Sequence, residues 1–190
     1  MTLELIIATV LPLILYVVVE VKKGPQAATI TAMVSVVVLA AYLYFRFDML
    51  DETYLVELAL ILGLGAVSLK MQRSTWFKFQ PLVTGIIFAF YGFYLQLFGT
   101  PFLVKMLPMI EKVAIPQMTA IMNTKEGLNL FSSMSLELSV VILLHAFVCG
   151  YAAHKWSSLM WLLTRLAIYP LVMVYFLLRW VPFLIANMQP

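Results

Sequence analysis

The C-terminal third of the chain contains two long apolar runs with only a few polar residues between them. Residues 135–153 and 158–186 are mostly hydrophobic, and His154, Lys155 and Trp156 separate them. A helix of about 20 apolar residues crosses the hydrocarbon core of a bilayer. Lipid offers the backbone no hydrogen bonds, so a single apolar segment that crosses it must be helical. The sequence therefore predicts two membrane-spanning helices joined by a tight turn.

The composition of the whole chain supports the same class of protein. Of its 190 residues, 64% are hydrophobic and 11% are charged, whereas soluble domains have about 45–50% apolar and about 25% charged residues. The net charge of +3 is typical of basic loops beside a membrane, and no segment alternates bases with aromatics as nucleic-acid binding requires. We expect an integral membrane protein that does not bind nucleic acid.

Four further apolar runs precede the closing pair. The N-terminus lacks the positive region of a secretory signal peptide, so we expect its apolar run to span the membrane. The predicted fold is an all-α polytopic helix bundle in a single domain, residues 1–190, with about six transmembrane helices; five spans and a re-entrant element is the alternative. The predicted spans are residues 3–21, 27–45, 54–69, 81–98, 135–153 and 158–186.

The segment between the fourth and fifth spans, residues 99–134, cannot itself cross a membrane. It contains three prolines, five methionines and scattered charges. Phe102, Met106, Met109 and Val113 follow a helical stripe, which predicts a helix that lies in the interface or caps the bundle. A partly ordered connecting loop is the alternative, and its methionines would also suit a partner-docking surface.

The charges of the turns predict an orientation. The first, third and fifth turns carry six Lys or Arg residues, whereas the second and fourth carry four. Because basic turns stay in the cytoplasm, we expect the odd-numbered turns to be cytoplasmic. With six spans, both termini would then be periplasmic.

Several charged residues lie in or beside the predicted spans. On this orientation Glu4, Glu57, Glu137 and Arg179 share the outer boundary, where they would form a proton, cation or headgroup site, or would simply reach into water. His145 and Arg165 lie deeper, each ten residues from position 155. They are expected at one level, either as a structural link or as a transport or headgroup site.

Sequence motifs for catalysis are missing. The chain contains no glycine-rich phosphate loop and no HExxH, GxSxG or CxxC motif. His145 and Cys149 are four residues apart, but two ligands without a third do not define a metal site. We therefore predict no catalytic residue, no metal and no cofactor, with a membrane-embedded lipid enzyme as an alternative.

Short motifs, in order from residue 11 to residue 168, resemble the inner-membrane septation protein A family of bacteria, also called the intracellular septation or inner membrane-spanning protein family. The residues that carry the resemblance are Leu11-Pro12-Leu13, Ala27-Ala28-Thr29, Arg46-Phe47, Gly63-Leu64-Gly65, Trp76-Phe77-Lys78-Phe79, Pro81, the segment from Thr100 to Leu107, Ile115-Pro116 and Leu128-Asn129. The resemblance fades after Ser133, so it does not extend to most of the closing pair of spans.

The resemblance implies a multi-pass protein of the bacterial inner membrane. Its expected roles are envelope maintenance, septation or elongation, and phospholipid homeostasis, exerted through membrane lipids and other envelope proteins. Arg46, Lys78 and Lys105 match charged positions of the family, and with Arg179 they are the expected lipid or partner contacts. The alternative is a small transporter or channel for a lipid, proton or solute. It would use four intramembrane polar residues: Glu57, Glu137, His145 and Arg165. The sequence gives no indication of an oligomeric state.

Overall fold

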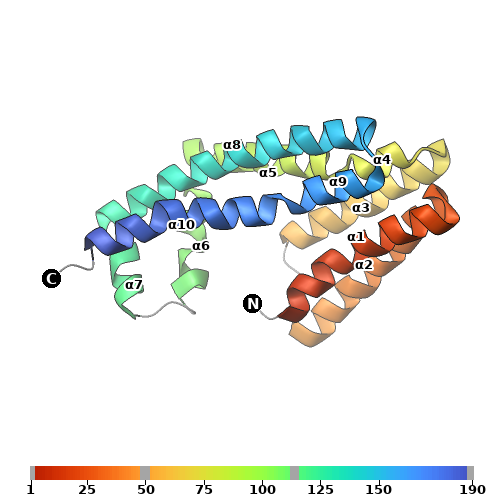
Figure 1. Cartoon of the computed structure of the whole chain (residues 1–190). Helices are drawn as coiled ribbons and strands as arrows, with labels where there is room; N and C mark the ends of the chain where they lie inside the picture. Colours follow the sequence, from red (N-terminus) through yellow and green to blue (C-terminus); the bar gives the residue numbers. More distant parts are fainter. Residues whose placement is uncertain (1–2, 48–51, 112–115, 188–190) are drawn as a thin grey trace. The chain divides into compact units, whose positions relative to one another are not determined.

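The computed structural model describes residues 3–47, 52–111 and 116–187, which form helices joined by short turns. By contacts they divide into unit 1, Met1–Thr84 with Phe147–Arg165, and unit 2, Gly85–Ala146 with Leu166–Pro190. The helices, labelled in Figure 1, are α1 (Leu3–Lys23), α2 (Pro25–Phe47), α3 (Glu52–Met71), α4 (Ser74–Lys78), α5 (Gln80–Phe98), α6 (Phe102–Glu111), α7 (Pro116–Met122), α8 (Lys125–Lys155), α9 (Ser158–Leu166) and α10 (Ile168–Asn187).

Four helical segments of the described residues are long and apolar enough to cross a membrane, which makes the chain a helical membrane protein. They are Pro25–Tyr42, Ser74–Phe98, Lys125–Lys155 and Ser158–Asn187, and Leu58–Met71 is a shorter apolar helix. The four segments contain most or all of the second, fourth, fifth and sixth predicted spans. The third predicted span coincides mainly with the shorter helix, and the first lies in α1. The count of six spans therefore stays a prediction.

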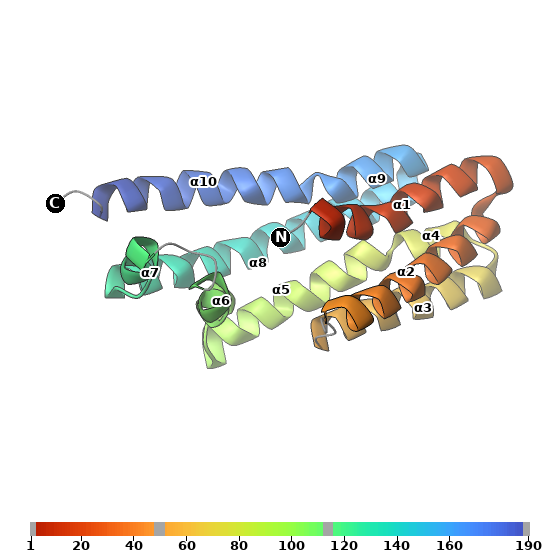
Figure 2. The same ribbon diagram turned by 90° about the horizontal axis from the view of Figure 1, so that it is seen from below.

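In unit 1, α1 packs along α2 and α2 packs along α3 (Figures 1 and 2). The turn between α1 and α2 is short because Gly24 adopts a positive φ of 86°, a conformation that costs glycine little. The Gly24 N–H donates to the Glu20 carbonyl at 3.0 Å. Pro25 then opens α2, where its missing N–H would have had no helical partner.

In unit 2, glycines allow α5 and α8 to approach closely. A Cβ placed on Gly85 would lie 2.5 Å from the Cβ of Ala146, and one placed on Gly92 would overlap the Ser139 hydroxyl. Small residues permit such backbone contact between helices in lipid, where apolar area alone gives little attraction. The pairs Gly85–Ala146 and Gly92–Ser139 show that the two helices are antiparallel.

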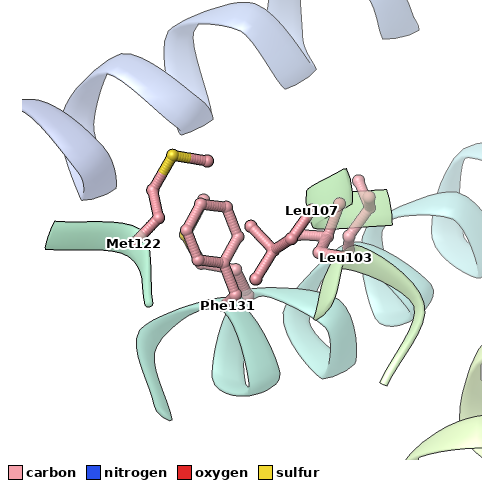
Figure 3. Packing of buried hydrophobic residues seen from close by; sticks show 6 residues of the cluster. Leu103, Leu107, Met122 and Phe131 are labelled. Carbon is pink, nitrogen blue, oxygen red and sulfur yellow. The ribbon is translucent and has the colours of Figure 1, made fainter. Parts of the chain in front are cut away.

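The segment expected at the interface contains α6, α7 and the first turns of α8. Leu103 and Leu107 of α6 pack with Met122 of α7 and Phe131 of α8 (Figure 3). Leu103 and Leu107 are therefore the most buried positions of α6, and Phe102 of the predicted stripe is partly buried against the same cluster. These positions are all apolar, so periodicity alone could not decide between them. Thr124 caps α8 by accepting a hydrogen bond from the Gly127 N–H at 3.0 Å.

The last predicted span is interrupted between α9 and α10. Pro170 is the third residue of α10, and its ring excludes the carbonyl of residue 166 from the normal helical position. The interruption at Ala167 therefore lies just before the proline. None of the residues of α10 is buried, and large exposed apolar side chains along it are typical of a helix that faces lipid.

Candidate functional site

Lys78 and Glu20 form an ion pair in the interior of unit 1. Lys78 Nζ lies 2.9 Å from Glu20 Oε1, and only 9% of the Lys78 side chain and 13% of the Glu20 side chain are exposed. Lys78 Nζ also donates to Ser158 Oγ at 2.6 Å. Burial of a charge is costly unless the charge has a partner. The pair therefore connects the end of α1, the end of α4 and the start of α9.

Aromatic rings surround the ion pair. The Tyr16 ring stacks on Phe77 with centroids 4.9 Å apart and meets the edge of Trp161 at 5.8 Å. The Tyr16 hydroxyl donates to Glu20 Oε1 at 3.3 Å, and Trp161 Nε1 donates to the Lys78 carbonyl at 3.0 Å. Both buried aromatic donors are thus satisfied. We call this group the Glu20–Lys78 cluster: Tyr16, Glu20, Phe77, Lys78, Ser158 and Trp161.

The spacing of residues along α1 and the positions of the ends of α4 and α9 bring the cluster residues together. Tyr16 and Glu20 are four residues apart, so they share one face of α1. α4 has only five residues, and both Phe77 and Lys78 at its end are buried. At the start of α9, Ser157 Oγ accepts from the Met160 N–H at 3.4 Å. Each of the three segments adjoins an odd-numbered turn.

A second ion pair joins α8 and α10 in unit 2, where the two helices lie side by side (Figure 1). Arg179 donates from Nη2 to Glu137 Oε1 at 2.7 Å, and the Tyr175 hydroxyl donates to Glu137 Oε2 at 2.6 Å. The side chains of Glu137 and Arg179 are both 41% exposed. This group, named the Glu137 triad, is open to its surroundings, in contrast to the Glu20–Lys78 cluster.

Of the other predicted polar residues, Arg165 borders the Glu20–Lys78 cluster. The Arg165 guanidinium lies over the Trp161 ring, 5.9 Å from its centroid, in unit 1. His145 is half-buried on α8 in unit 2. Their expected proximity stays a prediction. Lys105 is exposed on α6, while the side chains of Arg46 and Glu57 lie outside the described part of the structure.

Glu20 and Tyr16 were not predicted as site residues. Glu20 is the last acid before a basic turn, at the end of an otherwise apolar run. Lys78 lies in the third turn and Ser158 lies just after the fifth. Because a multi-pass protein has its odd-numbered turns on one side of the bilayer, Glu20 at the first turn and Lys78 at the third are expected at the same level. That shared level was the signal that could have linked Glu20 to Lys78. The packing of Tyr16 and Trp161 around them had no comparable signal.

Two cavities have linings that are mainly apolar. One of about 410 Å³ lies between α1 and α2 and is lined by aliphatic side chains, with Ser35 and Tyr42 as its polar members. The other, about 80 Å³, lies between α5 and α8 in unit 2. Neither has Glu137, His145 or Arg165 in its lining. Within the described ranges, no three His, Cys, Asp or Glu side chains converge on a metal position.

Comparison with known proteins finds a similarity over part of the chain. Over 92 residues it is 29% identical to the inner membrane-spanning protein YciB of Hydrogenovibrio crunogenus. The matched stretch is 48% of this chain and 41% of that protein, so the chain aligns with less than half of its relative. No family model matches the chain, and no solved structure matches it.

Proposed function

We propose that the chain is a multi-pass protein of the bacterial inner membrane that maintains the cell envelope, in septation, elongation or phospholipid homeostasis. It acts by contacts with lipids and partner proteins rather than by catalysis. The observation that carries this proposal is the similarity to an inner membrane-spanning protein over nearly half of the chain. The apolar helices are consistent with such a location.

The partners of the charged side chains favour this role over transport or catalysis. Glu20 pairs with Lys78 and Glu137 pairs with Arg179 within the chain, and of these carboxylate oxygens Glu20 Oε2 is buried without a hydrogen-bond partner. A transporter would need polar groups that line an accessible path, and an enzyme would need titratable groups that converge on a pocket. Lys105 and Arg179 are exposed and suit external contacts, whereas the buried Lys78 suits a structural role.

The proposal is tested by deletion of the gene in its bacterial host. We expect abnormal cell length or septum placement, and raised permeability to a dye after osmotic shock, both restored by the wild-type chain. Normal shape and permeability in the deletion strain would contradict the proposal. In the same strain, failure of folded Glu137→Gln, His145→Gln and Arg165→Gln variants to complement, together with solute flux in proteoliposomes, would favour the transporter.

The orientation makes a separate prediction that labelling can test. Cysteines are introduced singly at Lys23, Lys155 and Asn187 in a Cys149→Ala background, because Cys149 is the one natural cysteine. With cytoplasmic odd turns and periplasmic termini, an impermeant maleimide should label only Asn187→Cys in spheroplasts and all three after lysis. Labelling of Lys155→Cys and Asn187→Cys from the same side would contradict a last segment that crosses the membrane.

A further inference from the structure

The Glu137 triad lies one membrane thickness along α8 from the turn that joins α8 to α9. Glu137 precedes Lys155 by 18 residues in a continuous helix, which is about 27 Å at 1.5 Å per residue. The hydrocarbon core is about 30 Å thick. If the basic turn lies at one interface, the triad therefore lies at the other. The residues of α8 that precede Glu137 include several serines and Asn129, as expected beyond the hydrocarbon.

The surroundings of Arg179 are those of a headgroup layer. Trp180 packs on Phe131 with centroids 4.9 Å apart and stacks on Phe183 at 5.4 Å. Tryptophan concentrates at the boundary between lipid and water, where its ring is apolar and its N–H reaches polar groups. Arg179 is next in sequence and 41% exposed, so its guanidinium is available at this level.

The Glu137 triad has unused hydrogen-bond donors on its cation and unused acceptor positions on its carboxylate. A guanidinium carries five N–H donors; Arg179 donates from Nη2 to Glu137 Oε1 and also interacts with the Tyr175 hydroxyl, which leaves other donors of the fork unused. The remaining edge of the fork suits a phosphate, which accepts two parallel hydrogen bonds from arginine. Each Glu137 oxygen accepts one hydrogen bond. A carboxylate has about four acceptor positions, so Glu137 can also accept from an ammonium group.

From this charge pattern we infer that the Glu137 triad binds a zwitterionic aminophospholipid headgroup, the phosphoethanolamine type. Arg179 holds its phosphate and Glu137 accepts from its primary ammonium. A phosphoglycerol headgroup has the same phosphate charge but only neutral hydroxyls in place of the ammonium, so it has no cation to pair with Glu137. A phosphocholine headgroup is also zwitterionic, but its quaternary nitrogen has no N–H to donate. The inference deepens the proposed lipid contact and rests on it.

Native mass spectrometry of the full chain in detergent tests the inference. The protein is mixed with equal amounts of phosphatidylethanolamine, phosphatidylglycerol and phosphatidylcholine that carry the same acyl chains. We expect ethanolamine adducts to exceed glycerol adducts about fivefold, the scale of a half-exposed charge pair. Arg179→Gln should reduce the ethanolamine adducts by about the same factor. Glu137→Gln should retain adducts but lose the preference for ethanolamine over choline and glycerol.

Arg73→Gln is the matched control, because Arg73 is also exposed but lies in the turn before α4; its adducts should equal those of the wild type. Equal retention of ethanolamine and glycerol lipids by the wild type would overturn the inference. So would an unchanged preference in folded Glu137→Gln, even if Arg179→Gln does not fold. Deletion of the gene, as described above, tests the envelope role separately. A normal deletion strain with selective adducts would refute that role and leave the headgroup site standing.

Discussion

Replacement of Lys78 by methionine is expected to destabilise unit 1 by about 3 kcal/mol, at the lower end of the cost of leaving a buried charge without its partner. The variant keeps the length and apolar stem of the lysine but removes the ammonium that pairs with Glu20 and donates to Ser158. No other base is paired with Glu20 in the described part of the chain. The free energy of unfolding, measured by titration with sodium dodecyl sulfate in mixed micelles, gives the magnitude.

Lys23→Met is the matched control for this prediction, since Lys23 also lies at the end of α1 but is exposed; it should change the free energy of unfolding by less than about 0.5 kcal/mol. The double variant Glu20→Gln with Lys78→Met should recover most of the loss, because neither side chain is then charged. A loss no larger than that of Lys23→Met would show that the pair contributes nothing. Additive losses in the double variant would show that the two residues act independently.

Apolar length was enough to predict most of the long helices. What the pattern left open was which apolar positions of α6 are most buried. Leu103 and Leu107 are buried beside Phe131 of α8, while Phe102 is partly buried against the same cluster. α8 also begins at Lys125, well before the predicted span. Its early polar residues argued against a span, but they are no obstacle to a helix outside the hydrocarbon.

Counting residues along the predicted spans was enough to predict part of the candidate site. It placed Glu137 and Arg179 at one level, and their side chains are 2.7 Å apart in the structure. The family resemblance, by contrast, suggested Lys78 as a lipid or partner contact, and the structure buries Lys78 beside Glu20. Level along the membrane normal follows from counting residues. The direction in which a side chain points at that level depends on helix rotation, which only packing partners such as Tyr16 and Trp161 fix.

The contact between α5 and α8 is a second case in which packing partners could not be predicted from the sequence. α5 is rich in aromatic residues, yet its glycines are what allow it to approach α8 closely. A methyl group added at Gly85 would lie 2.5 Å from the Ala146 Cβ and 3.5 Å from the Ile142 carbonyl oxygen. Neither atom is the tip of a flexible side chain, so the two backbones would have to separate.

Gly85→Ala should therefore destabilise unit 2 by about 1–3 kcal/mol, the usual cost of overpacking, in the same detergent titration. Gly63→Ala is the control, because a Cβ at Gly63 of α3 meets nothing within 4 Å. It should leave stability unchanged or raise it by up to about 1 kcal/mol through helix propensity. The double variant Gly85→Ala with Ala146→Gly moves one methyl group from α8 to α5 and should recover most of the loss. If it recovers none, the cost lies in the α5 backbone itself, and close helix approach is not what glycine provides there.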